Sequence, residues 1–175
     1  SGGANNNTLR FVDTDVTTQA NQSFGKIEFE TKDTNNAGVN AFINAFSEGS
    51  GGTGALSFGT GSAGSTERMR IDSSGRVGIG ETGMSAYDSD ADDLVIKTGG
   101  NTGITVRTSS TGTGSIFFSD GTSGAERYQG TIRYFHNGNA MTFGTGTAER
   151  MRIDSSGRVG ICLLYTSDAA DDLLC

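Results

Sequence analysis

Proline and tryptophan are absent from this 175-residue sequence, which contains one histidine and two cysteines. A histidine-based catalytic triad would have to be built around His136 alone. Both cysteines, Cys162 and Cys175, lie in the last 14 residues, so they indicate no disulfide framework for the rest of the chain. No apolar run approaches the roughly 18 residues of a membrane-spanning helix. The sequence also lacks the charged start and short apolar stretch of a secretion signal, so no such signal is expected.

Glycine is abundant instead, at 28 residues, while 33% of the chain is hydrophobic. A thin core struggles to offset the entropy of ordering the backbone, about 1–2 kcal/mol per residue. The chain is therefore expected either to be partly disordered or to complete its core with partner chains. Its net charge of -7 comes from 20 acidic and 13 basic residues without a basic stripe, so nucleic acid is not an expected partner.

The strongest feature is an internal repeat. The segment Glu67–Ile79 returns unchanged as Glu149–Ile161, an offset of 82 residues, and a weaker match continues upstream with offsets of 85 and 89. The changes in offset place the insertions and deletions in loops, and two units of about 85 residues are predicted. The weaker matches pair Leu56–Gly61 with Met141–Gly146 and Gly25–Phe29 with Gly114–Phe118.

The repeated segment predicts a β-hairpin. Asp72 and Gly75 suit the first and last positions of a type I turn, and Gly75 can take the positive φ of a three-residue loop. With this loop Ile71 faces Val77 and the apolar side chains share one face, whereas a one-residue shift moves them to the other face. The candidate residues are four turn residues, Asp72, Gly75, Asp154 and Gly157, and eight structural core residues, Met69, Ile71, Val77, Ile79, Met151, Ile153, Val159 and Ile161.

A second hairpin is predicted at the Asn137-Gly138 turn signal, where Tyr134 would pair with Met141. No amphipathic helix is expected before residue 160, apart from a turn of one within 84–94. The predicted fold class is all-β: tandem repeats of short antiparallel β-hairpins or meanders, elongated and fibre-like, completed by oligomerisation.

The segment Glu67–Gly80 and its copy resemble the ERMRIDSSGRVGIG-type repeat of phage tail-fibre and tailspike shafts, which often precedes an intramolecular chaperone domain. The resemblance covers about residues 25–80 and 114–161 and implies an oligomeric virion appendage that reaches the host surface. This chain departs from it after Gly80, where the usual stretch with serine and proline is replaced. Residues 162–175 resemble a translated sequencing-adaptor artefact of metagenomic fragments, with a real helical tail as the alternative.

The domain prediction follows these boundaries. It places an N-terminal link at 1–24, the first β repeat at 25–80, an acidic link with the leading strands of the second repeat at 81–113, the second repeat at 114–161 and a non-native tail at 162–175.

Two patterns resemble ligand sites. The glycines at 59–64 match a dinucleotide-binding loop, but a β-patterned segment follows them where that site requires a helix, so a flexible interstrand loop is expected. An acidic cluster, Asp88, Asp90, Asp92 and Asp93, has the opening spacing of a calcium loop and then lacks its glycine and glutamate. A solvated acidic link is the preferred interpretation, and a cation site is the alternative.

The repeated arginines are the one basic feature. Alternation with apolar residues predicts a solvated face, with Asp72–Arg76 and Asp154–Arg158 as cross-strand pairs, and an anionic glycan as the alternative contact. They are Arg68, Arg70, Arg76, Arg150, Arg152 and Arg158.

The sequence therefore predicts a non-catalytic shaft segment of a phage tail fibre, located in the virion and directed towards the host. No cofactor, metal, nucleic acid or membrane insertion is expected. The expected partners are two further copies in a homotrimer, other virion tail proteins, and a host surface glycan bound through a distal part. The alternatives are a carbohydrate-binding or depolymerase part of a tailspike, and a bacterial surface adhesin.

Overall fold

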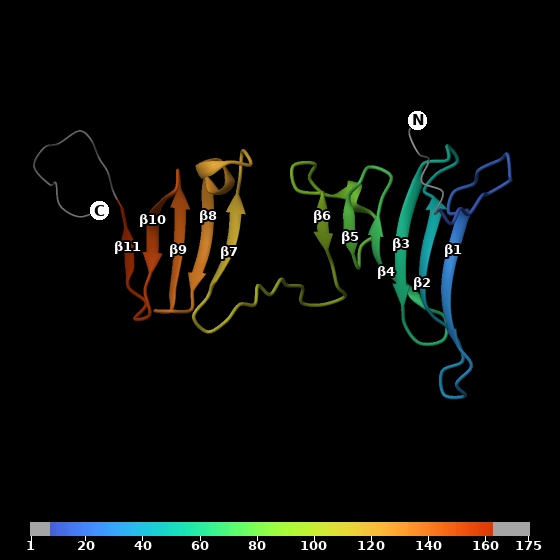
Figure 1. Ribbon diagram of the computed structural model, residues 1–175, viewed down its shortest axis with the longest axis horizontal. Coiled ribbons are helices and arrows are strands. Elements are labelled where there is room, and N and C mark those ends of the chain that lie inside the picture. The colour runs from blue at the N-terminus through green and yellow to red at the C-terminus, as the bar shows by residue number, and fades with distance from the viewer. Residues whose placement is uncertain (1–7, 163–175) are drawn as a thin grey trace, which may run out of the picture. The chain divides into compact units, whose positions relative to one another are not determined.

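The computed structural model describes residues 8–162, and over that range the chain is all-β, as predicted, with two short 3-10 helices and no α-helix. The 3-10 helices are η1 (Met84–Ala86) and η2 (Gly124–Tyr128). The chain divides into two compact units, Ser1–Gly103 and Ile104–Cys175, each with its own sheet (Figure 1). Among the described residues no helix is long and apolar enough to cross a membrane. Apart from Cys162, the predicted non-native tail and its Cys175 lie outside the described residues.

The first unit holds a six-stranded sheet whose strands follow one another in chain order. All neighbours are antiparallel except β5 and β6, which run parallel. The strand β6 belongs to the segment that the sequence predicted as an acidic link, and the structure shows it paired into the first sheet. The strands are β1 (Ser23–Thr31), β2 (Gly38–Ser47), β3 (Gly54–Thr60), β4 (Thr66–Ile71), β5 (Val77–Ile79) and β6 (Leu94–Ile96).

The second unit holds a five-stranded antiparallel sheet, also in chain order. β11 forms one edge of this sheet and β7 the other. The strands are β7 (Thr113–Phe118), β8 (Gly130–Phe135), β9 (Ala140–Thr145), β10 (Ala148–Ile153) and β11 (Val159–Ile161).

The two identical hairpins have the register that the sequence predicts. Ile71 pairs with Val77 in the first hairpin, and β10 pairs with β11 in the corresponding way. Gly75 and Gly157 close the loops at φ of 87° and 78°. This left-handed region disfavours residues with a side chain, so glycine is required where the loop turns back.

The hairpin between β8 and β9 keeps the predicted register, with Tyr134 opposite Met141. Its turn differs from the expected two-residue turn. Positive φ occurs at Gly138 and Asn139, at 99° and 48°, instead of at the Asn137-Gly138 pair. The connection is a four-residue loop over 136–139. The predicted register still holds, because this loop is longer than the expected turn by one residue on each side.

Both sheets are single-layered over the described residues. Substantial contacts between elements join hydrogen-bonded neighbours, and the one further pair is β7 with η2. Few apolar side chains are fully enclosed as a result, which agrees with the low hydrophobic content of the sequence. The buried apolar residues are Phe46, Ala55, Met84, Val95 and Ala140.

Candidate functional site: a repeated apolar face

One face of each sheet carries a row of large apolar side chains that crosses the sheet from strand to strand. Each member lies directly opposite the next in the ladder, where side chains on one face are close enough to pack. We call this surface the apolar face. Its row is Ile27, Ile43, Phe58, Met69, Ile79 and Ile96 in the first sheet, and Ile116, Ile132, Phe143, Met151 and Ile161 in the second.

A shorter row runs beside it on the same face. The two rows contain all eight structural core residues that the sequence singled out. The second row is Ala45, Leu56, Ile71, Val77 and Leu94 in the first sheet, and Tyr134, Met141, Ile153 and Val159 in the second.

The core candidates taken from the sequence did not include the members of these rows on β1, β2, β3, β6 and β7. On β8, the hairpin predicted at Asn137-Gly138 already paired Tyr134 with Met141 and Ile132 with Phe143, and both pairs are confirmed. Ile27 and Ile116 lie inside the weaker repeat match, so the signal was present in the sequence. Ile43 and Ile132 lie outside that match. The ladder nevertheless places them at equivalent positions, because both pair with the isoleucine of the preceding strand.

The apolar face is open to solvent in the single chain. Ile27 is 40% exposed and Ile79 41%, and their equivalents Ile116 and Ile161 are 52% and 60% exposed. Contiguous exposed apolar surface of this kind marks an interaction site. Burial of the predicted core residues by neighbouring chains stays a prediction.

A segment outside the strands touches the apolar face ahead of the first strand of each unit. Phe11 lies over Gly25, where an added Cβ would be 2.6 Å from the Phe11 Cβ atom. Val106 lies over the equivalent Gly114, with 3.6 Å between such a Cβ and the Val106 Cγ1 atom. Both segments extend the exposed apolar surface, since Phe11 and Val106 each remain 51% exposed.

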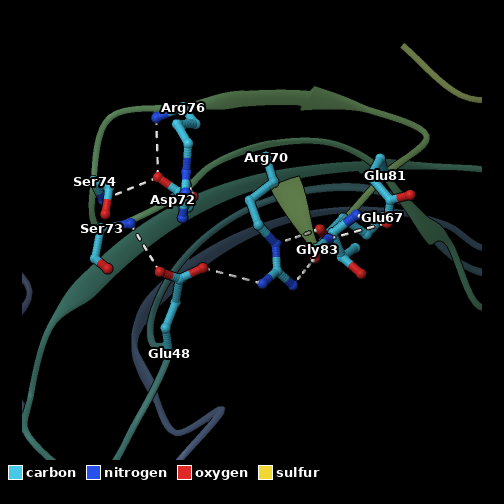
Figure 2. A network of polar contacts seen from close by, with 10 residues as sticks. Glu48, Glu67, Arg70, Asp72, Ser73, Ser74, Arg76, Glu81 and Gly83 are labelled. Atoms are coloured by element: carbon cyan, nitrogen blue, oxygen red, sulfur yellow. Dashed lines mark hydrogen bonds and ion pairs between the residues drawn. The ribbon is translucent and has the colours of Figure 1, made fainter. Parts of the chain in front are cut away.

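Asp72 organises the turn of the first hairpin (Figure 2). Its Oδ1 accepts hydrogen bonds from the backbone N–H groups of Ser74 and Arg76, both at 2.9 Å, and its Oδ2 accepts one from Arg76 Nε at 2.7 Å. Burial would raise the pKa of Asp72, but the hydrogen bonds from Arg76 and Ser74 outweigh it and the pKa is lowered. In the second hairpin the side-chain hydrogen bond from Arg158 lowers the pKa of Asp154. Both predicted cross-strand pairs are confirmed.

The opposite face of the first sheet is less solvated than predicted. Arg70 binds Glu67 through two hydrogen bonds of 2.7 and 3.0 Å, and it also reaches Glu48 at 3.3 Å (Figure 2). The Arg70 side chain is 15% exposed, so the prediction of a solvated arginine is wrong at this position. Arg152 keeps the equivalent pair with Glu149 and is 44% exposed.

The link after the first hairpin folds back onto that same face. Met84, in η1, is 1% exposed and lies over Gly78. Asp92 is 8% exposed and binds Arg76 at 2.9 Å, and the Asp93 carbonyl accepts a hydrogen bond from Val77 N–H. The prediction of a wholly solvated acidic link is therefore wrong, because a guanidinium already balances the charge of Asp92.

Glu81 holds the start of the link together. Its Oε1 accepts hydrogen bonds from the backbone N–H groups of Thr82 and Gly83, at 2.8 and 3.0 Å. Its Oε2 accepts hydrogen bonds from Tyr87 Oη at 2.8 Å and Lys97 Nζ at 2.7 Å. The Lys97 side-chain hydrogen bond, followed by those from Gly83 and Tyr87, lowers the pKa of Glu81 to about 2.

We expect the substitution Glu81→Gln to lower the melting temperature of the protein at pH 7 and to have progressively less effect in acid. The pKa of Glu81 is lowered from 4.5 to about 2 on folding, so the stability contributed by the carboxylate is full above pH 4.5 and is lost as the pH falls to 2. Thermal unfolding of both proteins from pH 7 to pH 2 checks this. In the control, Glu28→Gln, the replaced carboxylate binds Lys26 alone, at 2.7 Å, so a smaller difference is expected. A difference for Glu81→Gln that stays constant with pH would contradict the prediction.

The remaining sequence candidates show no assembled ligand site. The glycines at 59–64 lead from β3 into β4, and the loop is tied by Gly64 N–H to the Val39 carbonyl. His136 packs edge-on against Tyr134, with 4.9 Å between ring centroids. Among residues 8–162, no group of three or more histidine, cysteine, aspartate or glutamate side chains is placed to hold a metal ion.

Comparison with known proteins finds no family model and no curated sequence that matches the chain. Among solved structures, the chain is similar to the carboxy-terminal domain of the bacteriophage T5 L-shaped tail fibre, with 11% identity, a TM-score of 0.44, and coverage of 99% of this chain and 95% of that one. It is also similar to that domain with its intramolecular chaperone domain, with 10% identity and a TM-score of 0.39 over 98% of this chain and 62% of that one. The structural neighbours are tail-fibre domains.

Proposed function

We propose that this chain is a non-catalytic shaft segment of a phage tail fibre, in which three copies bury their apolar faces around a common axis. The observation that carries the proposal is the apolar row, whose first five positions have equivalents in both sheets and whose first and fifth positions are 40–60% exposed. A solitary patch could serve one local contact. A row present in both units favours the same kind of partner surface for each unit.

The single-layered sheets are suited to such an assembly. A sheet with one apolar face must cover that face with another layer. Among the described residues no second layer of strands or helices covers it, and Phe11 and Val106 touch it only near the first strand of each sheet. In a three-fold arrangement each chain contributes one wall, with the apolar face inward and the opposite face outward. The low hydrophobic content then suffices, because each interior is shared by three chains.

The outward face carries charges that are already paired. Arg70 with Glu67, and Arg76 with Asp72 and Asp92, form charge-assisted hydrogen bonds along the first hairpin. These three carboxylates of the described first unit are therefore bound by arginine, unlike the free buried acid that a glycoside hydrolase uses. A mechanical role is therefore better supported than a depolymerase role.

The function that follows is spacing and presentation. A trimeric shaft would hold a distal receptor-binding part away from the virion and would join other tail proteins at its ends. In this proposal that distal part binds a host glycan, and this chain holds the distal part at a fixed distance from the virion. This assigns the protein to the tail of the virion, directed towards the host surface.

Native mass tests the proposal directly. Light scattering after size exclusion should give three times the chain mass of 18.1 kDa, and the mass should not change on dilution. A stable monomer would mean that the exposed rows need no partner chain, and a stable dimer would replace the three-fold arrangement by a face-to-face pair of sheets. Either result would contradict the trimeric shaft.

A further inference from the structure

The two identical hairpins differ in what lies beside them. In the first unit β6 runs parallel to β5 and covers its outer edge. In the second unit β11 is an edge strand, and no described strand pairs with its outer side. Because the hairpin sequences are the same from Glu67 to Ile79 and from Glu149 to Ile161, the first hairpin shows what the second can bind.

The hydrogen-bond frame of the hairpin is the same in both copies. Gly80 N–H donates to the Arg68 carbonyl at 2.9 Å, and Cys162 N–H donates to the Arg150 carbonyl at the same distance. This frame turns the remaining backbone groups of the last strand outwards, where they can pair with another strand.

In the first hairpin these outward groups are satisfied by the link. Val77 N–H donates to the Asp93 carbonyl at 2.8 Å, and the Ile79 carbonyl accepts from Lys97 N–H at 2.9 Å. The equivalent groups of Val159 and Ile161 lie on the side of β11 where no strand of residues 8–162 is paired, and such an edge is a template for an added strand.

The two hairpins also differ in what lies over their central glycine, Gly78 in the first and Gly160 in the second. A Cβ added at Gly78 would lie 2.6 Å from Met84 Sδ, because the methionine fills the place over this glycine. A Cβ added at Gly160 would meet nothing within 4 Å. A hollow of about 370 Å³ borders this end of the hairpin, and its lining comprises Glu149, Arg150, Met151, Arg152, Gly160, Ile161 and Cys162.

The charges also match. Arg76 bridges two carboxylates, Asp72 at 2.7 Å and Asp92 at 2.9 Å. Arg158 binds Asp154 at 2.6 Å, and its side chain is 80% exposed. The guanidinium therefore retains donors for a second carboxylate.

We propose that the edge of the second hairpin is an acceptor site for a segment of the same kind as Glu81–Lys97, joined directly after Ile161. The segment would place a large apolar side chain over Gly160, a carboxylate against Arg158, and a three-residue apolar strand parallel to β11. Such a segment would close the second hairpin as the link 81–97 closes the first, and would protect its edge from other chains.

The residue immediately after the hairpin sets one further requirement. Gly80 has a φ of 72°, and a Cβ there would lie 2.1 Å from the Lys97 carbonyl oxygen. Position 162, the equivalent position, is a cysteine. The acceptor site therefore requires glycine after Ile161 for the link to pass close to the strand.

Insertion of a second copy of residues 80–98 between Ile161 and Cys162 of the full chain tests the proposal. Amide hydrogen exchange, measured by NMR, should show the Val159 amide exchanging about tenfold more slowly than in the unmodified chain, because its N–H donates to the added strand. The Val77 amide, which already has such a partner, provides the internal reference.

A matched insertion separates specific closure from the effect of any added chain. In it the inserted copy carries Met84→Ser and Asp92→Asn, which remove the side chain over the glycine and the carboxylate for Arg158. Protection of Val159 by the native insertion and not by the matched one supports the acceptor site. Equal protection by both insertions, or none by either while Val77 stays protected, overturns it.

Discussion

Replacement of Gly78 by alanine is expected to destabilise the first unit by about 1–3 kcal/mol, the usual cost of forcing an extra methyl group into filled space. The new Cβ would lie 2.2 Å from the Glu81 carbonyl oxygen and 2.6 Å from Met84 Sδ. A backbone oxygen cannot move aside as the end of a flexible side chain can. The link must therefore lift away from the hairpin, and β6 is expected to lose its pairing with β5.

The chain provides the control for this substitution, because Gly160 occupies the same place in an identical hairpin. Gly160→Ala meets nothing within 4 Å, so its effect is expected to stay within about 0.5 kcal/mol, as for other surface changes. Hydrogen exchange of the segments 66–79 and 148–161 in each variant measures the two units separately. Similar losses in both units would show that the glycine acts through strand propensity instead of through the link.

These two glycines also show where sequence analysis reaches its limit. The register of Ile71 opposite Val77 was predictable, because a period of two and a three-residue loop leave a single arrangement with all apolar side chains on one face. The environment of Gly78 was not predictable from the repeated segment, since the same residues surround Gly160 in the sequence. The difference comes from Met84, in a stretch without a clear periodic pattern.

Asp92 illustrates the same limit for charge. Its spacing from Asp88 and Asp90 indicated a solvated or cation-binding cluster, because local spacing was the only available signal. Its actual partner is Arg76, 16 residues earlier. That contact depends on β6 returning parallel to β5, and a three-residue strand is too short to be recognised by alternation of apolar and polar residues.

The apolar face itself was half predictable. Met69 and Ile79 followed from the repeated hairpin, whereas Ile43 joined the row through the pairing of β1 with β2. The proposed oligomer rests on the exposure of a single-layered sheet, and no one sequence motif specifies it.

Introduction of a charge into the apolar face is therefore expected to have the largest effect on assembly. The substitution Ile116→Glu should convert the proposed trimer into monomers of 18.1 kDa, because the three-fold axis would bring three carboxylates together in a dry interior where each loses its hydration. In the single chain Ile116 is 52% exposed, so the substitution is expected to leave the sheet itself folded.

The neighbouring residue is the matched control for Ile116→Glu. Phe117 is 50% exposed and belongs to the same strand, but alternation along β7 turns it to the opposite face, near Arg133 at 4.9 Å from its ring. Phe117→Glu should leave the native mass unchanged, since its carboxylate would face solvent and an arginine. Circular dichroism should show that both variants keep their strands. The milder substitution Ile116→Thr, which keeps the β-branched shape, should weaken assembly without abolishing it. Loss of the trimer in both glutamate variants, or in neither, would mean that the apolar face is not the surface that joins the chains.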